Sequence, residues 1–169
     1  SFTAETLTIN GTDKLSVSGG KATIGTAEIS AGGIVLTEET AAATITTLNL
    51  KGVADGLKVE NSKATVTGES INATGTGNTI TNSGAFTYTA VNVVAGDANS
   101  DLSITNTGKA ALGTVTVSAS VKGTATFAIG DSGTATADDI TVTGNDATHG
   151  ATLTVSGTAP AKVGDNQPN

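Results

Sequence analysis

Three oxygen-bearing side chains alternate along one short segment of the chain. Asp97, Asn99 and Asp101 are each separated by a single residue, and carboxylate and amide oxygens in such an alternation are ligands that Ca²⁺ prefers. Leu102 stands where the calcium loop of a helix-loop-helix module has Gly, and no Glu follows at the twelfth position. The segment is therefore a candidate calcium site, with an ordinary polar turn as the alternative.

The sequence offers little that could carry out catalysis. Its one histidine, His149, lies in a polar stretch, and its paired carboxylates are Glu38–Glu39 and Asp138–Asp139. The chain has no Cys, which excludes thiol catalysis and Cys-ligated metals. Arg and Trp, which solenoid enzymes acting on polysaccharides generally use, are also absent, and no His-Glu-x-x-His, Gly-x-Ser-x-Gly or P-loop pattern occurs. We predict a protein that is not an enzyme and has no cofactor apart from the candidate calcium.

Charge and hydropathy restrict the partners. The formal net charge is −7 and the pI is about 4.4, so nucleic acids and anionic membrane surfaces are disfavoured. No apolar run approaches the roughly 18 residues of a membrane span, so membrane insertion is not expected. The chain begins at Ser1. This start and the acidic, Cys-free composition favour an extracellular or cell-surface protein whose signal peptide has been removed.

Small residues dominate the composition. The 169 residues include 33 Thr, 25 Ala, 22 Gly and 13 Ser, whereas Leu, Ile, Val and Phe together number 36. Abundant β-branched residues with few charges argue against disorder. We expect an ordered, β-rich body with a thin core.

An internal repeat runs through the sequence. The segment 21–24 (KATI) recurs at 42–45, 63–66 and 84–87, each time after 21 residues, and the unit then lengthens to about 25. Two ladders of alternating apolar pairs follow this period, as strands with one buried face require. The first ladder is Leu7/Ile9, Ala27/Ile29, Leu48/Leu50, Ile71/Ala73, Val91/Val93, Val115/Val117 and Ile140/Val142. The second is Leu15/Val17, Ile34/Leu36, Leu57/Val59, Ile80, Leu102/Ile104, Phe127/Ile129 and Leu153/Val155.

Polar turns repeat at the unit boundary. They are Asn61-Ser62-Lys63, Asn82-Ser83-Gly84, Asn106-Thr107-Gly108 and Asp131-Ser132-Gly133. Asn and Asp accept left-handed backbone and bond their own main chain, so we expect these turns to stack. Each unit then contains about three short strands.

These units predict an all-β fold, a parallel β-solenoid of about seven coils of 21–25 residues. Residues 1–157 form one β domain, and residues 158–169 form a strand remnant and polar tail. The alternative is a β-sandwich or jelly roll completed by a neighbour's strand, favoured by the segment 91–117, in which two alternating strands flank an Asn-Thr-Gly turn.

Two resemblances point to the same setting. The Asn-Thr-Gly and Thr-Val-Ser-Gly phrases resemble the β-helical regions of prokaryotic surface adhesins and surface-layer proteins. The segment 91–117 resembles jelly-roll subunits of biofilm fibres and archaeal bundling pili. Both resemblances imply an extracellular structural role.

Three surface features complete the candidate sites. Phe2, Leu7 and Ile9 form an N-terminal strand that another subunit could pair with. Asn10 and Asn72 stand in Asn-x-Thr sequons for glycosylation. Thr-x-Thr pairs invite comparison with an ice-binding face, but the outward positions between the first ladder's pairs are no continuous Thr column: Thr8, Glu28, Asn49, Asn72, Asn92, Thr116 and Thr141.

We therefore expect a structural subunit of an extracellular filament or surface layer, which assembles with copies of itself through exposed strand edges. The alternative is a monomeric β-helical adhesin module that binds a cell-surface glycan or a host surface.

Overall fold

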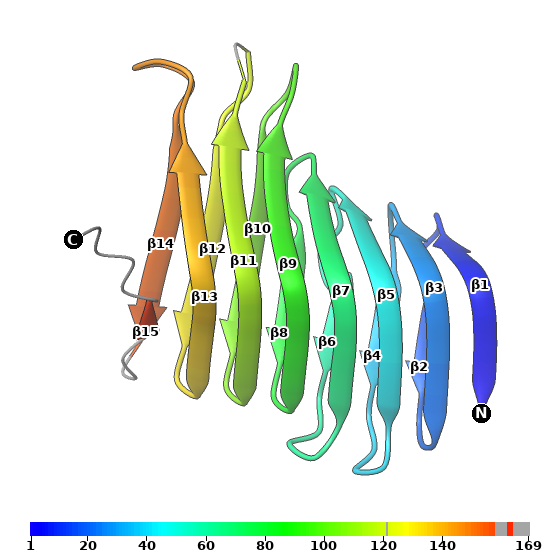
Figure 1. Cartoon of the computed structure of the whole chain (residues 1–169). Coiled ribbons are helices and arrows are strands. Elements are labelled where there is room, and N and C mark those ends of the chain that lie inside the picture. The colour runs from blue at the N-terminus through cyan, green and yellow to red at the C-terminus, as the bar shows by residue number, and fades with distance from the viewer. Residues whose placement is uncertain (121, 158–161, 164–169) are drawn as a thin grey trace.

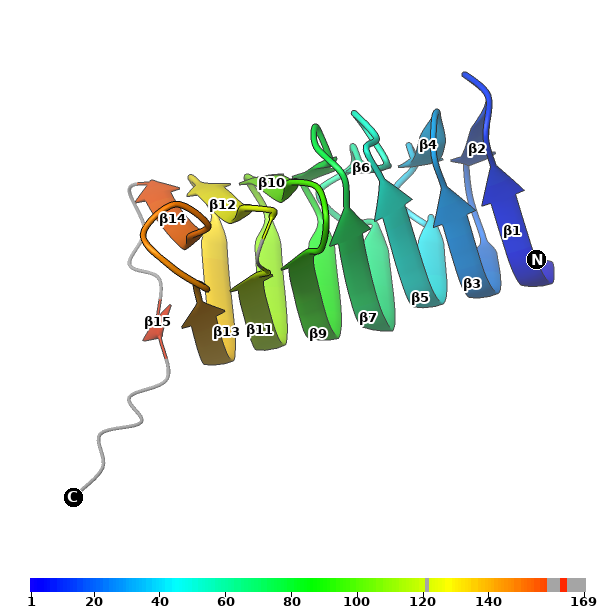
Figure 2. The ribbon, with the colours of Figure 1, turned by 90° about the horizontal axis from the view of Figure 1, so that it is seen from above.

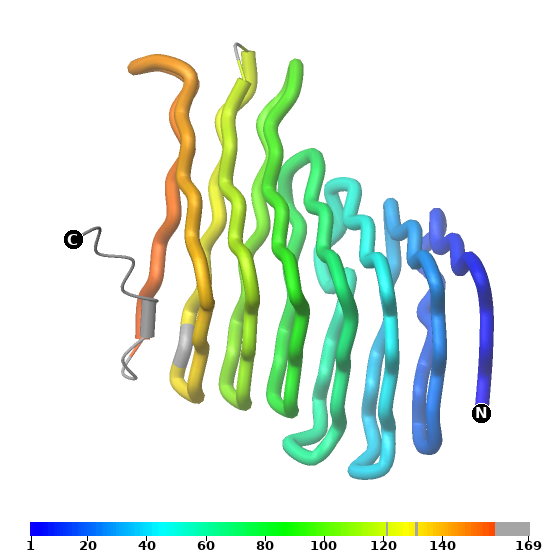
Figure 3. Tube along the Cα trace, in the orientation of Figure 1, coloured from blue at the N-terminus to red at the C-terminus, as the bar shows by residue number. Residues whose placement is uncertain are grey.

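The computed structural model describes residues 1–120, 122–157 and 162–163 and shows the chain wound into a stack of flattened coils (Figure 3). Each coil places one strand in each of two facing sheets, as the view from above shows (Figure 2). Sheet A has the order β1-β3-β5-β7-β9-β11-β13-β15, and sheet B has the order β14-β12-β10-β8-β6-β4-β2.

Apart from the two-residue β15, the odd-numbered strands are the longer ones (Figure 1). Sheet A consists of β1 (Phe2–Ile9), β3 (Lys21–Ile29), β5 (Ala42–Lys51), β7 (Thr65–Thr74), β9 (Ala85–Ala95), β11 (Lys109–Ala119), β13 (Thr134–Thr143) and β15 (Lys162–Val163). Sheet B consists of β2 (Lys14–Val17), β4 (Gly33–Leu36), β6 (Leu57–Val59), β8 (Thr79–Asn82), β10 (Ser100–Asn106), β12 (Ala125–Asp131) and β14 (Ala151–Gly157).

The predicted fold class is confirmed, because neighbouring strands of both sheets pair in parallel and come from successive coils. The jelly-roll alternative is wrong for the same reason, since its sheets are antiparallel. About seven coils at a strand spacing near 4.8 Å give a rod of roughly 35 Å. No helix in the described ranges is long and apolar enough to cross a membrane.

The expectation of three strands per coil is wrong, because two of them are one continuous strand. In β3, Ala22 and Ile24 point inward, Gly25 and Thr26 are both partly exposed, and Ala27 and Ile29 point inward again. The strand changes phase at two consecutive outward residues and continues. The same phase change recurs in β5 at Thr46 and Thr47.

The first apolar ladder is in the register that the sequence predicts, from Leu7 to Val142. The strict spacing of 21 is wrong after the third coil begins. Ala22 pairs with Ala43, but Ala43 pairs with Val66 and Val66 pairs with Phe86. Residues 63–64 belong to a longer turn. They lengthen the chain between two strands without changing where the next strand lies in the sheet.

The second ladder changes register at the fifth coil. Ile80 pairs with Ile104. Leu102 therefore lies two residues before the partner of Ile80, whereas the predicted ladder places Leu102 in the column of Ile80. This shift accompanies a widening of the coils. β8 has four residues and β10 has seven, and the last three coils extend further at one end of the sheets (Figure 1).

The core is a narrow lumen filled by inward side chains of both sheets, mostly Ala, Val, Ile and Leu. Its largest side chains are Tyr88, Phe86 and Phe127. The rings of Phe86 and Tyr88 lie 5.0 Å apart at 43°. Room for Tyr88 comes from the preceding coil, because a Cβ at Gly68 would overlap the tyrosine ring and the Ile45 carbonyl.

The C-terminal boundary is described only in part. β14 ends at Gly157, and a domain boundary there stays a prediction. Of the predicted strand remnant and polar tail, 158–161 and 164–169 lie outside the described residues. The backbone of 162–163 forms β15 and pairs with Thr136 and Ala137 of β13.

Candidate functional site

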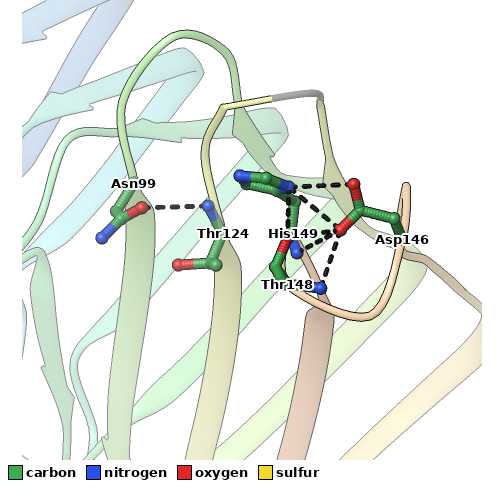
Figure 4. Close-up of polar contacts among 5 residues, drawn as sticks. All are labelled: Asn99, Thr124, Asp146, Thr148 and His149. Atoms are coloured by element: carbon green, nitrogen blue, oxygen red, sulfur yellow. Dashed lines mark hydrogen bonds and ion pairs between the residues drawn. The ribbon is translucent and has the colours of Figure 1, made fainter.

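The candidate calcium residues tie neighbouring coils together. Asp101 Oδ1 accepts hydrogen bonds from the backbone N–H groups of Gly77 (2.8 Å) and Asn78 (3.1 Å) in the preceding coil. Asn99 Oδ1 accepts one from Thr124 N (3.0 Å) in the following coil (Figure 4). Asp101 and Asn99 thus have partners in coils on opposite sides of their own. This geometry favours the turn interpretation, and calcium binding stays a prediction.

Asp97, the third member of the motif, is exposed and faces solvent. Its Oδ1 lies 3.5 Å from Lys122 Nζ in the following coil. An ion pair this exposed contributes little to stability. Among the residues that the structure describes, no group of three or more His, Asp or Glu side chains is arranged to hold a metal ion.

His149 lies in the loop between β13 and β14, close to Asp146 (Figure 4). Asp146 Oδ1 accepts hydrogen bonds from the backbone N–H groups of Thr148 (2.7 Å) and His149 (2.8 Å), and His149 Nδ1 lies 3.0 Å away. Hydrogen bonds hold the pKa of Asp146 well below its usual range. The one from the Thr148 side chain has the largest effect, and the one from the His149 side chain the next largest. This arrangement closes an exposed loop and resembles a turn rather than a reaction centre.

A ladder of amides runs along the outer face of sheet A. Asn92 Nδ2 donates to Asn72 Oδ1 (2.9 Å), Asn72 Nδ2 donates to Asn49 Oδ1 (2.8 Å), and Asn49 Nδ2 donates to Glu28 Oε1 (2.5 Å). Lys51 Nζ lies 2.7 Å from Glu28 Oε2. The hydrogen bond from Lys51, with a second from Asn49, lowers the pKa of Glu28.

The ladder places one of the two glycosylation candidates in the middle of a strand. The amide nitrogen of Asn72, which a glycan would modify, donates to Asn49, whereas the exposed Asn10 follows the end of β1. In the folded protein, the amide nitrogen of Asn72 is therefore already engaged in a hydrogen bond. Glycosylation of either residue stays a prediction.

A column of threonines that the sequence did not reveal lies on the same face of sheet A, five residues along each strand from the amide ladder. The outward residues in register along sheet A are Thr3, Thr23, Thr44, Thr67, Thr87, Ala111 and Thr136. The column between the first-ladder pairs, with its Glu and Asn residues, is in the expected register. The Thr column escaped notice because it depends on the corrected spacing of 23 and 20 residues.

The predicted assembly residues lie at the open end of the lumen. Phe2, Leu7 and Ile9 belong to β1, in register with the inward residues Ala22, Ala27 and Ile29. Phe2 is 44% exposed, Leu7 is partly buried and Ile9 is buried. Hollows at this end are lined by side chains that include Leu7, Leu15 and Val17.

The opposite end of the lumen carries an apolar pocket, which the sequence argument missed. Phe127, Ile129, Ile140, Leu153 and Val155 are among its lining residues. Val142 and Val155 remain 44% and 43% exposed. Both ends of the stack therefore present inward-facing apolar residues that no further coil covers in the described structure.

Asn78, also unrecognised from sequence, is the fully buried polar residue at the step between narrow and wide coils. Its Oδ1 accepts hydrogen bonds from Gly52 N (2.8 Å) and Val53 N (2.9 Å). Its Nδ2 donates to the carbonyls of Thr74, Gly75 and Asp101. One side chain therefore joins three successive coils.

The stacked turns are confirmed for the later coils. Asn82 Nδ2 donates to Asn106 Oδ1 (2.7 Å), and both residues are buried. Gly108 must be glycine, because a Cβ would overlap the Gly84 carbonyl of the turn below it. Asn61 is not in this column, since Val59 pairs with Asn82.

Comparison with known proteins found no matching family model, no matching curated protein and no matching solved structure.

Proposed function

We propose that this chain is a structural subunit of an extracellular filament or surface layer, and that it assembles with copies of itself through the exposed strand edges of its end coils. The observation that supports this proposal is the pair of unlike, uncovered coil ends, each with unpaired strand edges among the described residues and exposed apolar side chains. Unpaired edges of this kind are templates for pairing with another chain. The acidic, Cys-free composition supports the extracellular setting.

The parallel stack also supports a directional polymer. The two ends of the rod offer different surfaces, and a contact between these unlike ends is head-to-tail. Contacts of this type produce open filaments when the rotation between subunits does not close a ring.

The test is a concentration series of the purified protein, followed by sedimentation velocity and negative-stain electron microscopy. We expect polymers whose size grows with concentration. Phe2→Asp should leave the protein monomeric, because it places a charge on the apolar end of the lumen.

Val94→Asp is the matched control. Val94 is 46% exposed and Phe2 is 44% exposed, but Val94 lies on the side of the rod in β9. The control should polymerise like the unmodified protein. Monomers at every concentration would contradict the proposal, and glycan arrays would then test the adhesin alternative.

A further inference from the structure

The two ends of the rod are complementary in direction. The free edge of β1 faces away from β3, and the outer edge of β13 faces away from β11, at the opposite end of sheet A (Figure 1). In sheet B, β2 and β14 are the two edge strands. A second copy placed head-to-tail would therefore continue both parallel sheets with the same hand.

The lumen columns show which register such a continuation would take. The column that contains Phe2 continues through six more residues in strict pairing: Ala22, Ala43, Val66, Phe86, Ala110 and Ala135. Two alanines follow Phe2, and two alanines follow Phe86. A Phe2 from the next copy above Ala135 would continue this alternation of one large side chain with smaller ones.

The other columns give consistent partners. In the same register, Leu7 of the second copy would follow Ile140, and Ile9 would follow Val142, which is exposed at present. In sheet B, the column of Leu15 reaches Val155 through Ile34, Leu57, Ile80, Ile104 and Ile129. The large apolar side chains exposed at the two ends, Phe2, Val142 and Val155, would each meet an apolar partner.

One element stands in the way of this contact. β15 pairs with β13 at Thr136 and Ala137, the positions that Thr3 and Ala4 of a second copy would take. Among the described residues, it leaves the edge beside Ile140 and Val142 open, together with the edge of β14. A second copy can therefore begin to pair there and then displace two residues of β15.

We infer that a second copy of this chain docks head-to-tail on the C-terminal coil, with β1 pairing in parallel with β13 so that Thr8 meets Thr141, with β2 following β14, and with β15 displaced. This inference rests on the proposed function and specifies its interface.

Disulfide cross-linking tests the register, because the natural sequence contains no Cys. Thr8 and Thr141 are both exposed and occupy the same outward column. Parallel neighbours lie about 4.8 Å apart, within the Cα range of about 4.4–6.8 Å that a disulfide spans. A Thr8→Cys/Thr141→Cys variant should give a ladder of covalent multimers on a non-reducing gel after oxidation.

The matched control is Thr3→Cys/Thr141→Cys, which uses another exposed Thr of β1. Thr3 lies five residues from Thr8, about 17 Å along the strand, so this pair should cross-link at least tenfold less. Equal cross-linking of the two variants would overturn the register. A Thr8→Cys single variant that gives dimers would also overturn it, because that product requires two N-terminal ends to meet.

A truncation tests the displacement of β15. Removing residues 158–169 should lower the concentration at which polymers appear, because β13 then offers its whole edge. Unchanged or weaker assembly would overturn this step. Filaments without specific cross-links would refute this interface and leave the proposed function standing, whereas the absence of polymers under every condition would refute the proposed function itself.

Discussion

Tyr88 buries a hydroxyl in the lumen where no described atom accepts or donates a hydrogen bond to it. Burial raises the pKa of this phenol, so the side chain is neutral in the folded protein. An unpartnered buried hydroxyl costs about 1–3 kcal/mol of desolvation. The ring fills the space above Gly68.

Tyr88→Phe keeps the ring and removes the hydroxyl. We expect the free energy of unfolding to stay equal or to rise by about 1 kcal/mol, measured by urea denaturation. Gly68→Ala is the contrasting variant and should destabilise the protein, because its new methyl group overlaps the Tyr88 ring. A loss of more than about 1 kcal/mol in Tyr88→Phe would show that the hydroxyl has a partner.

Glu28 makes the free energy of unfolding depend on pH. The hydrogen bond from Lys51 lowers its pKa in the folded state. A depressed carboxyl pKa stabilises the fold above the unfolded pKa of about 4.3. This contribution is lost as the pH falls through the folded value.

Glu28→Gln keeps the acceptor for Asn49 and removes the charge that faces Lys51. The variant should be less stable than the unmodified protein near pH 7, and the difference should shrink as the pH falls below about 4. Chemical denaturation at several pH values measures it. A difference that is constant with pH would contradict this role of Glu28.

At the scale of strands and turns, the coil step depends on Asn78. Replacing it with Ala removes its hydrogen bonds to the N–H groups of Gly52 and Val53 and to three carbonyls. Backbone hydrogen bonds remain from Gly52 N to the Thr74 carbonyl and from Asp101 N to the Gly75 carbonyl, both 3.0 Å. We expect Asn78→Ala to cost at least about 3 kcal/mol of unfolding free energy. Denaturation followed by circular dichroism measures the loss.

Asn61→Ala is the matched control for that variant, since Asn61 is partly exposed and, among the described residues, its side chain accepts a hydrogen bond only from the nearby Lys63 N–H. It should change stability by no more than about 0.5 kcal/mol. Similar losses in the two variants would mean that Asn78 is not the residue that holds the step.

The strands show what sequence reasoning could and could not find. The pairs from Leu7/Ile9 to Ile140/Val142 were predictable, because inward aliphatic residues alternate within every coil. The phase change at Gly25 and Thr26 was not, because two adjacent outward residues look like a turn. Asn78 was missed because its role depends on backbone groups in three coils, which one sequence window does not reveal.

The candidate functional site also has features that the sequence could predict and features that it could not. The apolar side chains of β1 were predictable from Phe2 and from the alternating residues Leu7 and Ile9. The apolar pocket at the other end was not, because it combines residues from β11 to β14 whose proximity depends on register. The partners of Asp97, Asn99 and Asp101 lie in neighbouring coils, about 25 residues away, so their spacing alone suggested a cation.

At the scale of the whole molecule, one outward column would oppose the proposed assembly. Its members along sheet A are Glu5, Gly25, Thr46, Glu69, Thr89, Gly113 and Asp138. Within the chain, no two acids are neighbours in this column. Head-to-tail docking would place Glu5 of one copy beside Asp138 of the other, and like charges directly opposite are destabilising.

Glu5→Lys should therefore lower the concentration required for assembly, and Asp138→Lys should do the same. The double variant restores a like-charge pair and should assemble no better than the unmodified protein. Sedimentation velocity at low salt measures the three, because added salt screens exposed charges. Independent effects that add in the double variant would contradict the contact.

The backbone hydrogen bonds of both sheets lie along the axis of the rod, while the chain itself runs across it. Tension applied along that axis therefore loads the hydrogen bonds between two coils one after another, so that the coils unwind in sequence. Each coil of about 20–25 residues would release roughly 70–85 Å of extended chain. A rod of this design would yield in small repeated steps and absorb mechanical work without separating from its neighbours all at once.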